Sequence, residues 1–185
     1  MNTVYMIAVV AENGEEIVMS GGIRKALLKV RCYDSEGVLS SAYLVLSELS
    51  ELRKTTGFAI GDVIFFSGSL VEGAKDKVAI HPSDIYILRK GVLPITEENK
   101  TLIDARLIPY RNDRNIVAFD GDVCASEKEN VCIRIKNEFT FRGDSDGEYH
   151  IWVVNRLKKA VKIGDKVTFV GEYSEEKLVG SVYKS

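Results

Sequence analysis

Residues 60–68 read IGDVIFFSG, and residues 163–171 read IGDKVTFVG. Two glycines and one phenylalanine keep the same spacing in both stretches: Gly61, Phe66 and Gly68 in the first, and Gly164, Phe169 and Gly171 in the second. Each stretch is typical of a turn that leads into an apolar strand, and a late glycine allows such a strand to bend. Similarity at a fixed separation indicates a repeated unit.

Segments upstream of the two stretches repeat in the same order. In this alignment Lys29 matches Arg134, and Arg31 matches Lys136. The matched segments are EEIVMSGG (15–22) with RNIVAFDGD (114–122), ALLKVRCY (26–33) with VCIRIKNE (131–138), SAYLVLS (41–47) with YHIWVVN (149–155), and the helix-like segments 47–54 and 155–162. Such a series of elements in one order indicates a diverged duplication.

The composition is that of a nearly neutral globular protein. The 185 residues are 45% hydrophobic and carry a formal net charge of −2. Residues 1–95 hold 10 basic and 11 acidic side chains, and residues 96–185 hold 15 and 16. Because neither half is basic, the sequence argues against a simple polycationic nucleic-acid binder.

Neither secretion nor a membrane span is predicted. The chain does not open with a basic segment followed by an apolar one, and no apolar run approaches the ~20 residues of a membrane span. The cysteines Cys32, Cys124 and Cys132 are an odd number without a close pair, which favours a reduced, cytoplasmic setting. Cys32 and Cys132 fall in apolar strands, where a free cysteine behaves as a small hydrophobe.

The order of predicted elements favours a tandem OB fold, an all-β class with two short helices. Each half reads as five strands with one helix between the third and fourth strands, which is the OB order. We expect domains at 1–90 and 101–185, joined by a linker at 91–100 that contains proline and charges. The predicted strands are 4–11 with 15–19, 26–33, 39–46, 62–72 and 77–88, then 101–109 with 115–119, 130–141, 148–154, 165–173 and 177–183.

The stretch EYHIWVVNRLKKAVKIGDKVTFVGEY (148–173) resembles bacterial single-stranded-DNA-binding proteins. In that family a third strand with tryptophan and histidine is followed by a small helix, a glycine-containing turn and a strand with a late glycine. The resemblance implies OB folds, single-stranded DNA as partner and a role in DNA replication or repair. The family commonly assembles four OB domains, which implies a homodimer for a chain with two.

OB folds bind single strands on the face of the second and third strands, where cations meet phosphates and rings stack on bases. Lys29 and Arg31 alternate with apolar residues, as do Arg134 and Lys136, so each basic pair is predicted on one strand face. Lysines and arginines on a solvated strand face without a ligand are the alternative.

Several aromatic residues lie near the predicted face, and each could instead be part of a core. Trp152 and Phe141 are favoured as base platforms, because Ile151 and Val153 can fill the inward positions beside Trp152. The loop-like stretch 109–115 adds Tyr110, Arg111 and Arg114 as candidates, or forms a charged hairpin tip. The aromatic residues near this face are Tyr33, Tyr43, Phe139, Phe141, Tyr149 and Trp152, and Tyr33 is also a candidate binding residue.

Catalysis is not indicated by any motif. The sequence has no phosphate-cradling glycine loop, nucleophile elbow or catalytic Cys–His motif. Cys124 and Cys132 lack the close spacing of a zinc knuckle. We therefore expect no enzyme activity, no cofactor and no bound metal.

These observations favour a non-catalytic protein that binds single-stranded DNA through tandem OB folds with little sequence preference. The near-neutral charge of both halves favours the alternative, a protein-interaction module of two OB-like barrels that binds no nucleic acid. RNA as the ligand stays open, because a contact to a 2′-hydroxyl leaves no mark in a sequence.

Overall fold

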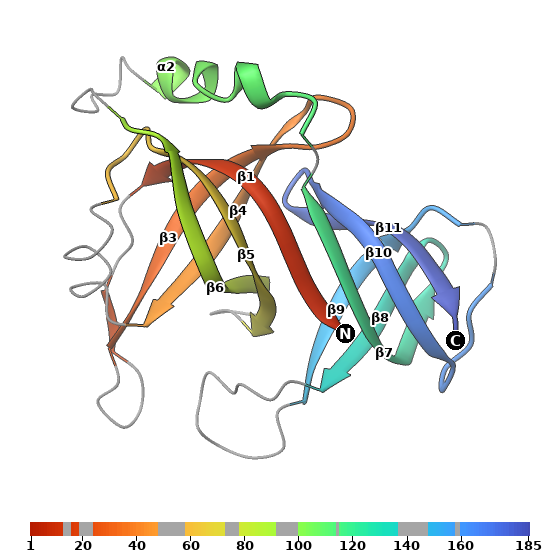
Figure 1. Ribbon diagram of the computed structural model, residues 1–185. Coiled ribbons are helices and arrows are strands. Elements are labelled where there is room, and N and C mark those ends of the chain that lie inside the picture. The colour runs from red at the N-terminus through yellow and green to blue at the C-terminus, as the bar shows by residue number, and fades with distance from the viewer. Residues whose placement is uncertain are drawn as a thin grey trace.

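Two β-barrels lie side by side in the computed structural model (Figure 1). Within its described residues no helix is long and apolar enough to cross a membrane. The structure describes residues 1–12, 16–18, 24–47, 58–72, 78–91, 100–113, 115–136, 148–157 and 160–185.

The first barrel is a closed sheet of five strands with one short additional strand. The strands are β1 (Asn2–Glu12), β2 (Glu16–Val18), β3 (Arg24–Tyr33), β4 (Leu39–Ser47), β5 (Val63–Glu72) and β6 (Val78–Arg89). β1 pairs with β3 and β5, β3 pairs with β4, and β6 closes the barrel between β4 and β5. β2 extends the sheet beside β3. The strand order predicted for the first half is confirmed.

The second barrel repeats this connectivity. Its strands are β7 (Ile116–Glu127), β8 (Asn130–Lys136), β9 (Glu148–Asn155), β10 (Lys166–Ser174) and β11 (Lys177–Lys184). β7 pairs with β8 and β10, β8 pairs with β9, and β11 lies between β9 and β10, parallel to β9. The all-β class and the OB order of strands are therefore confirmed.

Residues 101–109, predicted as a strand, are helical instead. Helix α2 (Lys100–Ala105) is followed by the single turn η3 (Ile108–Tyr110), and α2 lies above the first barrel in Figure 1. Ile103 and Leu107 are four residues apart and pack with Val9 and Val63 of the first barrel. This helical spacing of apolar residues explains the outcome. Residues 92–99 of the predicted linker lie outside the described residues, so the domain boundary stays a prediction.

The helix predicted over 155–162 does not form at the residues of this segment that the structure describes. Asn155, the first residue of that segment, accepts a hydrogen bond from the amide of Leu157 at 3.1 Å. The same oxygen accepts the amide of Val182 at 3.1 Å, so Asn155 joins the end of β9 to β11, its neighbour in the sheet. Of the corresponding segment in the first half, 47–54, Ser47 ends β4 and the rest lies outside the described residues.

The turns that open the two matched stretches have the same contacts. In each, a glycine with φ of 84° or 90° donates its amide to the first strand of its barrel at 2.8 Å. The aspartate that follows accepts, on its carboxylate, the amide three residues before it at 2.7 Å. The residues are Gly61, Asp62, Ala59 and Val10 in the first barrel, and Gly164, Asp165, Lys162 and Val123 in the second.

Strand pairing corrects the predicted alignment of the two copies. β1 and β7 each contain a bulge at the same point, and counting from these bulges makes Arg31 the counterpart of Arg134. The alignment of Arg31 with Lys136 and of Lys29 with Arg134 is therefore wrong by two residues. A shift of two keeps every side chain on the same face of a strand, so the alternating pattern alone does not distinguish the registers.

The first strands were also aligned wrongly. The segment 15–22 contains the short strand β2, whereas the counterpart of β7 is β1, because both pair with the second and fourth strands of their barrels. Both segments contain an Ile-Val pair with a glycine a few residues later, which explains the false match.

The barrels join where the first halves of β1 and β7 pair antiparallel. Val4 lies opposite Val117, and these two valines occupy equivalent positions, opposite Gly68 and Gly171. The pairing is therefore symmetric about an approximate twofold axis at the two valines. Apolar side chains of both barrels form one contiguous buried cluster across this junction.

Two equivalent asparagines hold the junction. Buried Asn115 accepts the amide of Tyr173 on its Oδ1 at 2.6 Å, and its Nδ2 donates to the carbonyl oxygen of Tyr33 in the first barrel at 2.6 Å. Asn2 accepts the amide of Leu70 at 2.9 Å and donates to its carbonyl at 3.0 Å, as Asn115 does with Tyr173 at 2.6 and 3.5 Å. The Nδ2 of Asn2 also donates to the Tyr149 hydroxyl of the second barrel at 3.3 Å. A side chain at the start of each first strand thus binds the fourth strand of the same barrel.

Replacing Asn115 by alanine should destabilise the protein. The change leaves the amide of Tyr173 and the carbonyl of Tyr33 buried without their partner, and each such group costs about 1–3 kcal/mol. We expect the free energy of unfolding, measured by urea titration, to fall by about 2–6 kcal/mol. Asn112→Ala, in an exposed turn, is the matched control and should change it by less than about 0.5 kcal/mol. Equal effects of the two changes would contradict this role.

Candidate nucleic-acid interface

The outer face of β8 and β9 is polar, whereas the inner face is part of the core. Alternate residues of both strands point inward and are almost fully buried, as period two requires. These inward residues are Val131, Ile133, Ile135, Tyr149, Ile151 and Val153. The outward positions between them hold Arg134, Lys136, His150 and Trp152.

Trp152 projects from this face with 51% of its surface exposed. Ile151 and Val153 on either side are buried, so the predicted outward direction of the indole is confirmed. Cys132 lies directly opposite Trp152 on β8, and Arg134 lies opposite His150. The exposed ring of Trp152 and the guanidinium group of Arg134 therefore belong to cross-strand pairs that are two residues apart, on the same face of the sheet.

The cations of this face have carboxylate partners that solvent reaches. Arg134 is 3.3 Å from Asp122 and 3.6 Å from Glu148, and Lys136 is 3.8 Å from Glu148. Ion pairs between exposed side chains contribute only about 0–1 kcal/mol. A phosphate can therefore replace these carboxylates at small cost.

The two predicted cations of the first barrel differ in their surroundings. Lys29 pairs with the exposed Glu12 at 3.0 Å. Arg31 pairs with Asp104 of α2 at 2.7 Å, and both side chains are about one-third exposed or less. Helix α2, which lies where the sequence predicted a strand, thus supplies the partner of Arg31.

Of the remaining predicted residues, Tyr33 and Tyr110 are half-buried and pack with Ile103 and Leu107 at the α2 side of the first barrel. Arg111 is exposed and lies against Gly37, since a Cβ there would be 3.1 Å from its Nε. Three predicted aromatic or basic residues lie outside the described residues: Arg114, Phe139 and Phe141. The described candidates therefore form two groups, one on each barrel.

A groove of about 520 Å³ separates the outer faces of β4 and β9. Tyr43 and Ser41 come from β4, and Trp152 and His150 come from β9. The other lining residues are Ala42, Val78, Tyr173, Glu176, Lys177 and Leu178. Tyr43 is not among the binding residues that the sequence predicts, although the signal is present: Ala42 and Leu44 beside it are buried, as Ile151 and Val153 are beside Trp152.

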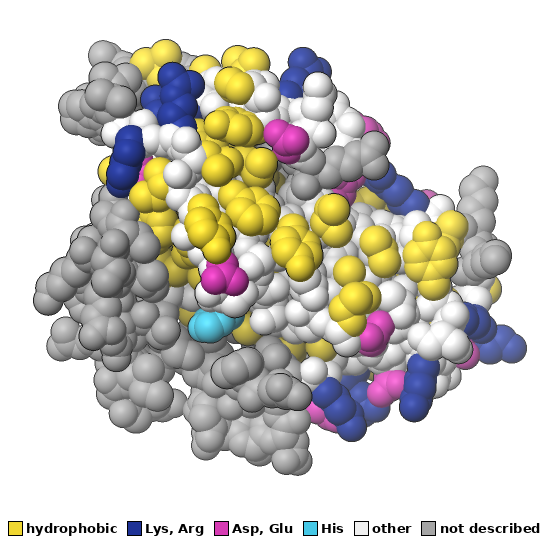
Figure 2. Space-filling model, in the orientation of Figure 1, with side chains coloured by type: hydrophobic (Ala, Val, Ile, Leu, Met, Phe, Trp, Pro, Cys, Tyr) yellow, Lys and Arg dark blue, Asp and Glu magenta, His cyan; other side chains and the backbone are white. Residues whose placement is uncertain are grey.

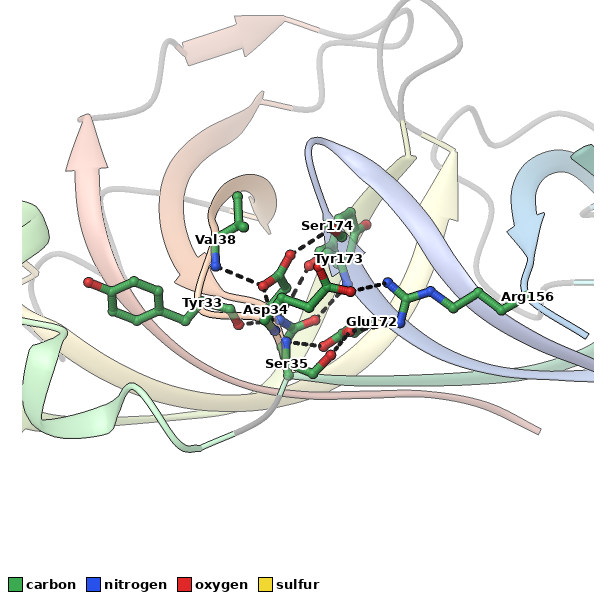
Figure 3. A network of polar contacts seen from close by, with 10 residues as sticks. Tyr33, Asp34, Ser35, Val38, Arg156, Glu172, Tyr173 and Ser174 are labelled. Atoms are coloured by element: carbon green, nitrogen blue, oxygen red, sulfur yellow. Dashed lines mark hydrogen bonds and ion pairs between the residues drawn. The ribbon is translucent and has the colours of Figure 1, made fainter. Parts of the chain in front are cut away.

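A polar network between the barrels determines the position of β4 relative to the second barrel (Figure 3). The turn after β3 contacts the end of β10: the Ser35 amide donates to Glu172 and the Ser174 hydroxyl donates to Asp34, both at 2.7 Å. Arg156 lies 3.8 Å from Glu172 and 3.4 Å from Glu36. These contacts, part-buried or exposed, therefore connect the turn after β3 of the first barrel to β10 of the second.

Asp34 is ionised within this network. Burial by itself raises the pKa of the carboxyl group, but hydrogen bonds from Ser174, Val38 and Glu36, with the charge of Arg156, outweigh it and lower the pKa below its usual value. Nearby Cys32 is in an apolar setting, and burial together with the charges of Asp34 and Glu172 raises its pKa to about 12. Its thiol is therefore an unreactive core group.

Metal-ligating side chains do not cluster in the described part of the chain. It holds no group of three or more His, Cys, Asp or Glu side chains placed to bind a metal ion. The Cys124 thiol donates to the carbonyl of Cys132 at 3.2 Å, and burial first, then the contact with Cys124, raises the pKa of Cys132 to about 12.

Comparison with known proteins identifies the fold. The wild-type single-stranded DNA binding protein from Thermus aquaticus superposes with a TM-score of 0.60 and 14% identity, over 100% of this chain and 93% of that one. The present chain therefore has the fold of that single-stranded DNA binding protein. A deletion mutant of the Thermus protein gives a TM-score of 0.54 at 14% identity, over 100% of this chain and 94% of the other.

Similarity is confined to structure. No protein-family profile matches the sequence, and no curated protein matches it in sequence. The Thermus likeness, at 14% identity, therefore shows the shared fold, and the ligand has to be inferred from the side chains of this chain.

Asp34→Asn should reduce the dependence of stability on pH below about pH 4. A carboxyl group whose pKa is lowered by folding stabilises the protein above its unfolded pKa of about 3.9, and this contribution is lost as pH falls through the folded value. At pH 7 the variant should be less stable by about 1–3 kcal/mol. Urea unfolding at pH 7, 5, 4 and 3 measures both effects. Asp84→Asn, on the exposed part of β6, should retain the wild-type profile; an unchanged profile for Asp34→Asn would contradict this role.

Proposed function

We propose that this protein binds single-stranded DNA without catalysis and with little sequence preference, through the outer face of β8 and β9. The observation that carries the proposal is the exposed indole of Trp152 beside Arg134, on a sheet face whose opposite side is fully packed. A base stacked on the indole of Trp152 would remove its apolar surface from water, which favours binding. The fold shared with the Thermus aquaticus single-stranded DNA binding protein supports the same reading.

Binding would combine stacking with charge neutralisation. A base stacked on Trp152 leaves its phosphates within reach of Arg134 and Lys136, which exchange exposed carboxylates for phosphate oxygens. Stacking on a ring is worth about 1–3 kcal/mol per base and tolerates every base. RNA would use the same contacts, so a comparison of oligo(dT) with oligo(U) belongs in the same experiment.

The alternative, a protein-interaction module without nucleic-acid binding, is favoured by the acidic partners of the four predicted cations. Lys29, Arg31, Arg134 and Lys136 all have carboxylates within 4 Å. Pairs that solvent reaches, such as that of Lys29 with Glu12, are weak, and salt weakens them further, so they do not prevent exchange with phosphate; the Arg31–Asp104 pair is less exposed. Salt dependence of binding separates the two functions.

Oligo(dT) should quench the fluorescence of Trp152, the chain's single tryptophan. Trp152→Ala should weaken binding, followed by a labelled oligonucleotide, by about 5- to 150-fold, which corresponds to about 1–3 kcal/mol of stacking. Its unfolding free energy should change by less than about 0.5 kcal/mol, because the ring is exposed. Unchanged emission at saturating oligo(dT) would exclude the stacking site.

The salt dependence has its own controls. If the four cations each neutralise one phosphate, log affinity falls with log salt at a slope of about −3, at −0.7 per contact. Arg134→Ala combined with Lys136→Ala should then reduce the slope by about 1.4. Lys128→Ala, in the exposed turn before β8, should leave it unchanged. A flat dependence in the wild type would favour the protein-interaction module.

We further propose that two chains form a homodimer through the opposite side of the molecule. Strands β11, β10, β7, β1, β5 and β6 lie side by side, and Figure 2 shows a band of hydrophobic side chains across their outer face. A sheet face of this kind is normally covered by another layer. The exposed apolar residues on it are Tyr5, Tyr86, Leu88, Ile116, Val170 and Tyr183.

Ile116→Glu should convert a dimer into a monomer. Ile116 lies opposite Tyr5 at the junction of the two barrels, and a charge there cannot be buried against an apolar surface without a partner. Sedimentation equilibrium should give twice the 20.6-kDa chain mass for the wild type and the chain mass for the variant. Ile163→Glu, in the exposed turn before β10, is the control and should remain dimeric. A monomeric wild type at micromolar concentration would contradict the homodimer.

A further inference from the structure

The rings on the two sides of the groove occupy equivalent positions in the two barrels. On β4, Tyr43 lies opposite Lys29, and on β9, Trp152 lies opposite Cys132, the counterpart of Lys29 when the strands are counted from their bulges. Both rings line the same groove of about 520 Å³. The approximate twofold axis thus brings the third strand of each barrel to one shared space.

We propose that this groove binds bases of a single nucleic-acid strand, so that Tyr43 and Trp152 contact the same strand and both barrels hold it at once. The proposal rests on the single-strand binding proposed above and specifies where the strand passes. A groove closed on one side by Tyr43 and on the other by Trp152 offers a base two aromatic surfaces, whereas the β8–β9 face by itself offers one.

The walls of the groove suit a stacked base. Tyr173 and Leu178 are almost fully buried and provide an apolar floor. Tyr43 packs partly against Val71 and Ala79, which restricts its ring before any ligand arrives. A ring already held in place loses little conformational freedom on binding.

Polar groups at the groove suit the edge of a base and its phosphate. Ser41 and His150 occupy equivalent outward positions, opposite Arg31 and Arg134 respectively. A hydroxyl group and an imidazole can both hydrogen-bond to base edges. Lys177 adds a cation that has no ion pair among the side chains the structure describes, whereas Glu176 beside it opposes its charge.

Hydrogen bonds between the barrels hold the two sides of the groove in place. The Asp34–Ser174 hydrogen bond and the amide of Glu175, which donates to the Ser40 hydroxyl at 2.7 Å, join the strand that carries Tyr43 to the β10–β11 hairpin. The hydroxyl group of Tyr149 on β9 reaches the carbonyl of Leu70 on β5 at 2.6 Å. The groove is therefore bounded by two barrels that are fixed to one another.

The test uses the full-length protein and an oligo(dT) of about 4–6 nucleotides, the lower end of the site size of one OB fold. Such a strand is too short to occupy two separate faces, so loss of affinity in both ring variants requires both rings to contact it. We expect Tyr43→Ala and Trp152→Ala each to weaken the one-to-one complex by at least about 5-fold. Tyr43→Phe should retain wild-type affinity.

Ile163→Ala is the control, because Ile163 is an exposed apolar residue in the turn before β10 and lies outside both the groove and the proposed dimer face. It should bind as the wild type does. Urea unfolding checks that Tyr43→Ala remains folded, and Tyr43→Leu, which keeps the apolar contact with Val71 but removes the aromatic ring, replaces it if it does not.

The outcomes separate this proposal from the one on which it rests. If the wild type binds oligo(dT) and Trp152→Ala weakens binding, whereas Tyr43→Ala binds like the Ile163→Ala control, the groove is excluded and binding to β8–β9 stands. If the wild type binds neither short nor long oligo(dT), both proposals fail together. Loss of affinity in both ring variants, with Tyr43→Phe unaffected, supports the groove.

Discussion

The antiparallel pairing of β1 with β7 is the contact on which the arrangement of this protein depends. It places Val4 against Val117, its own counterpart, and thereby relates the barrels by an approximate twofold axis. One side of the axis becomes a six-stranded surface with exposed apolar side chains, and the other side brings β4 and β9 to a common groove. Two surfaces of different chemistry thus follow from one set of main-chain hydrogen bonds.

The two barrels share their framework but differ in what covers them. The glycine turns, the capping aspartates and the junction asparagines are the same in both copies, because each satisfies main-chain groups that every such barrel has. The connecting segment breaks this equivalence, since α2 packs on the first barrel and Asp104 pairs with Arg31. Arg134, the counterpart of Arg31, pairs instead with two carboxylates on neighbouring strands, Asp122 and Glu148.

Local patterns in the sequence were sufficient for the strands other than the one predicted at 101–109, which is helical, and for the direction of Trp152. Alternation of buried and exposed residues is a property of each strand alone, so Ile151 and Val153 could be placed inward without knowledge of the rest. At the described residues of 155–162 the predicted helix does not form, and Asn155 there also hydrogen-bonds Val182 of β11, a contact that the local pattern does not contain. The groove could not be predicted, since it exists only once β1 and β7 have paired across more than a hundred residues of chain.

The symmetric junction also bears on the origin of the chain. Because β1 and β7 pair around equivalent residues, each barrel uses the corresponding edge of its first strand to contact the other barrel. A single barrel released from this chain would therefore have an unpaired edge that is complementary to itself, and unpaired edges recruit further strands. Two identical half-length chains would satisfy those edges with a true twofold axis in place of the approximate one. The covalent link between the halves turns an association that depends on concentration into an intramolecular one, and it leaves each copy free to diverge.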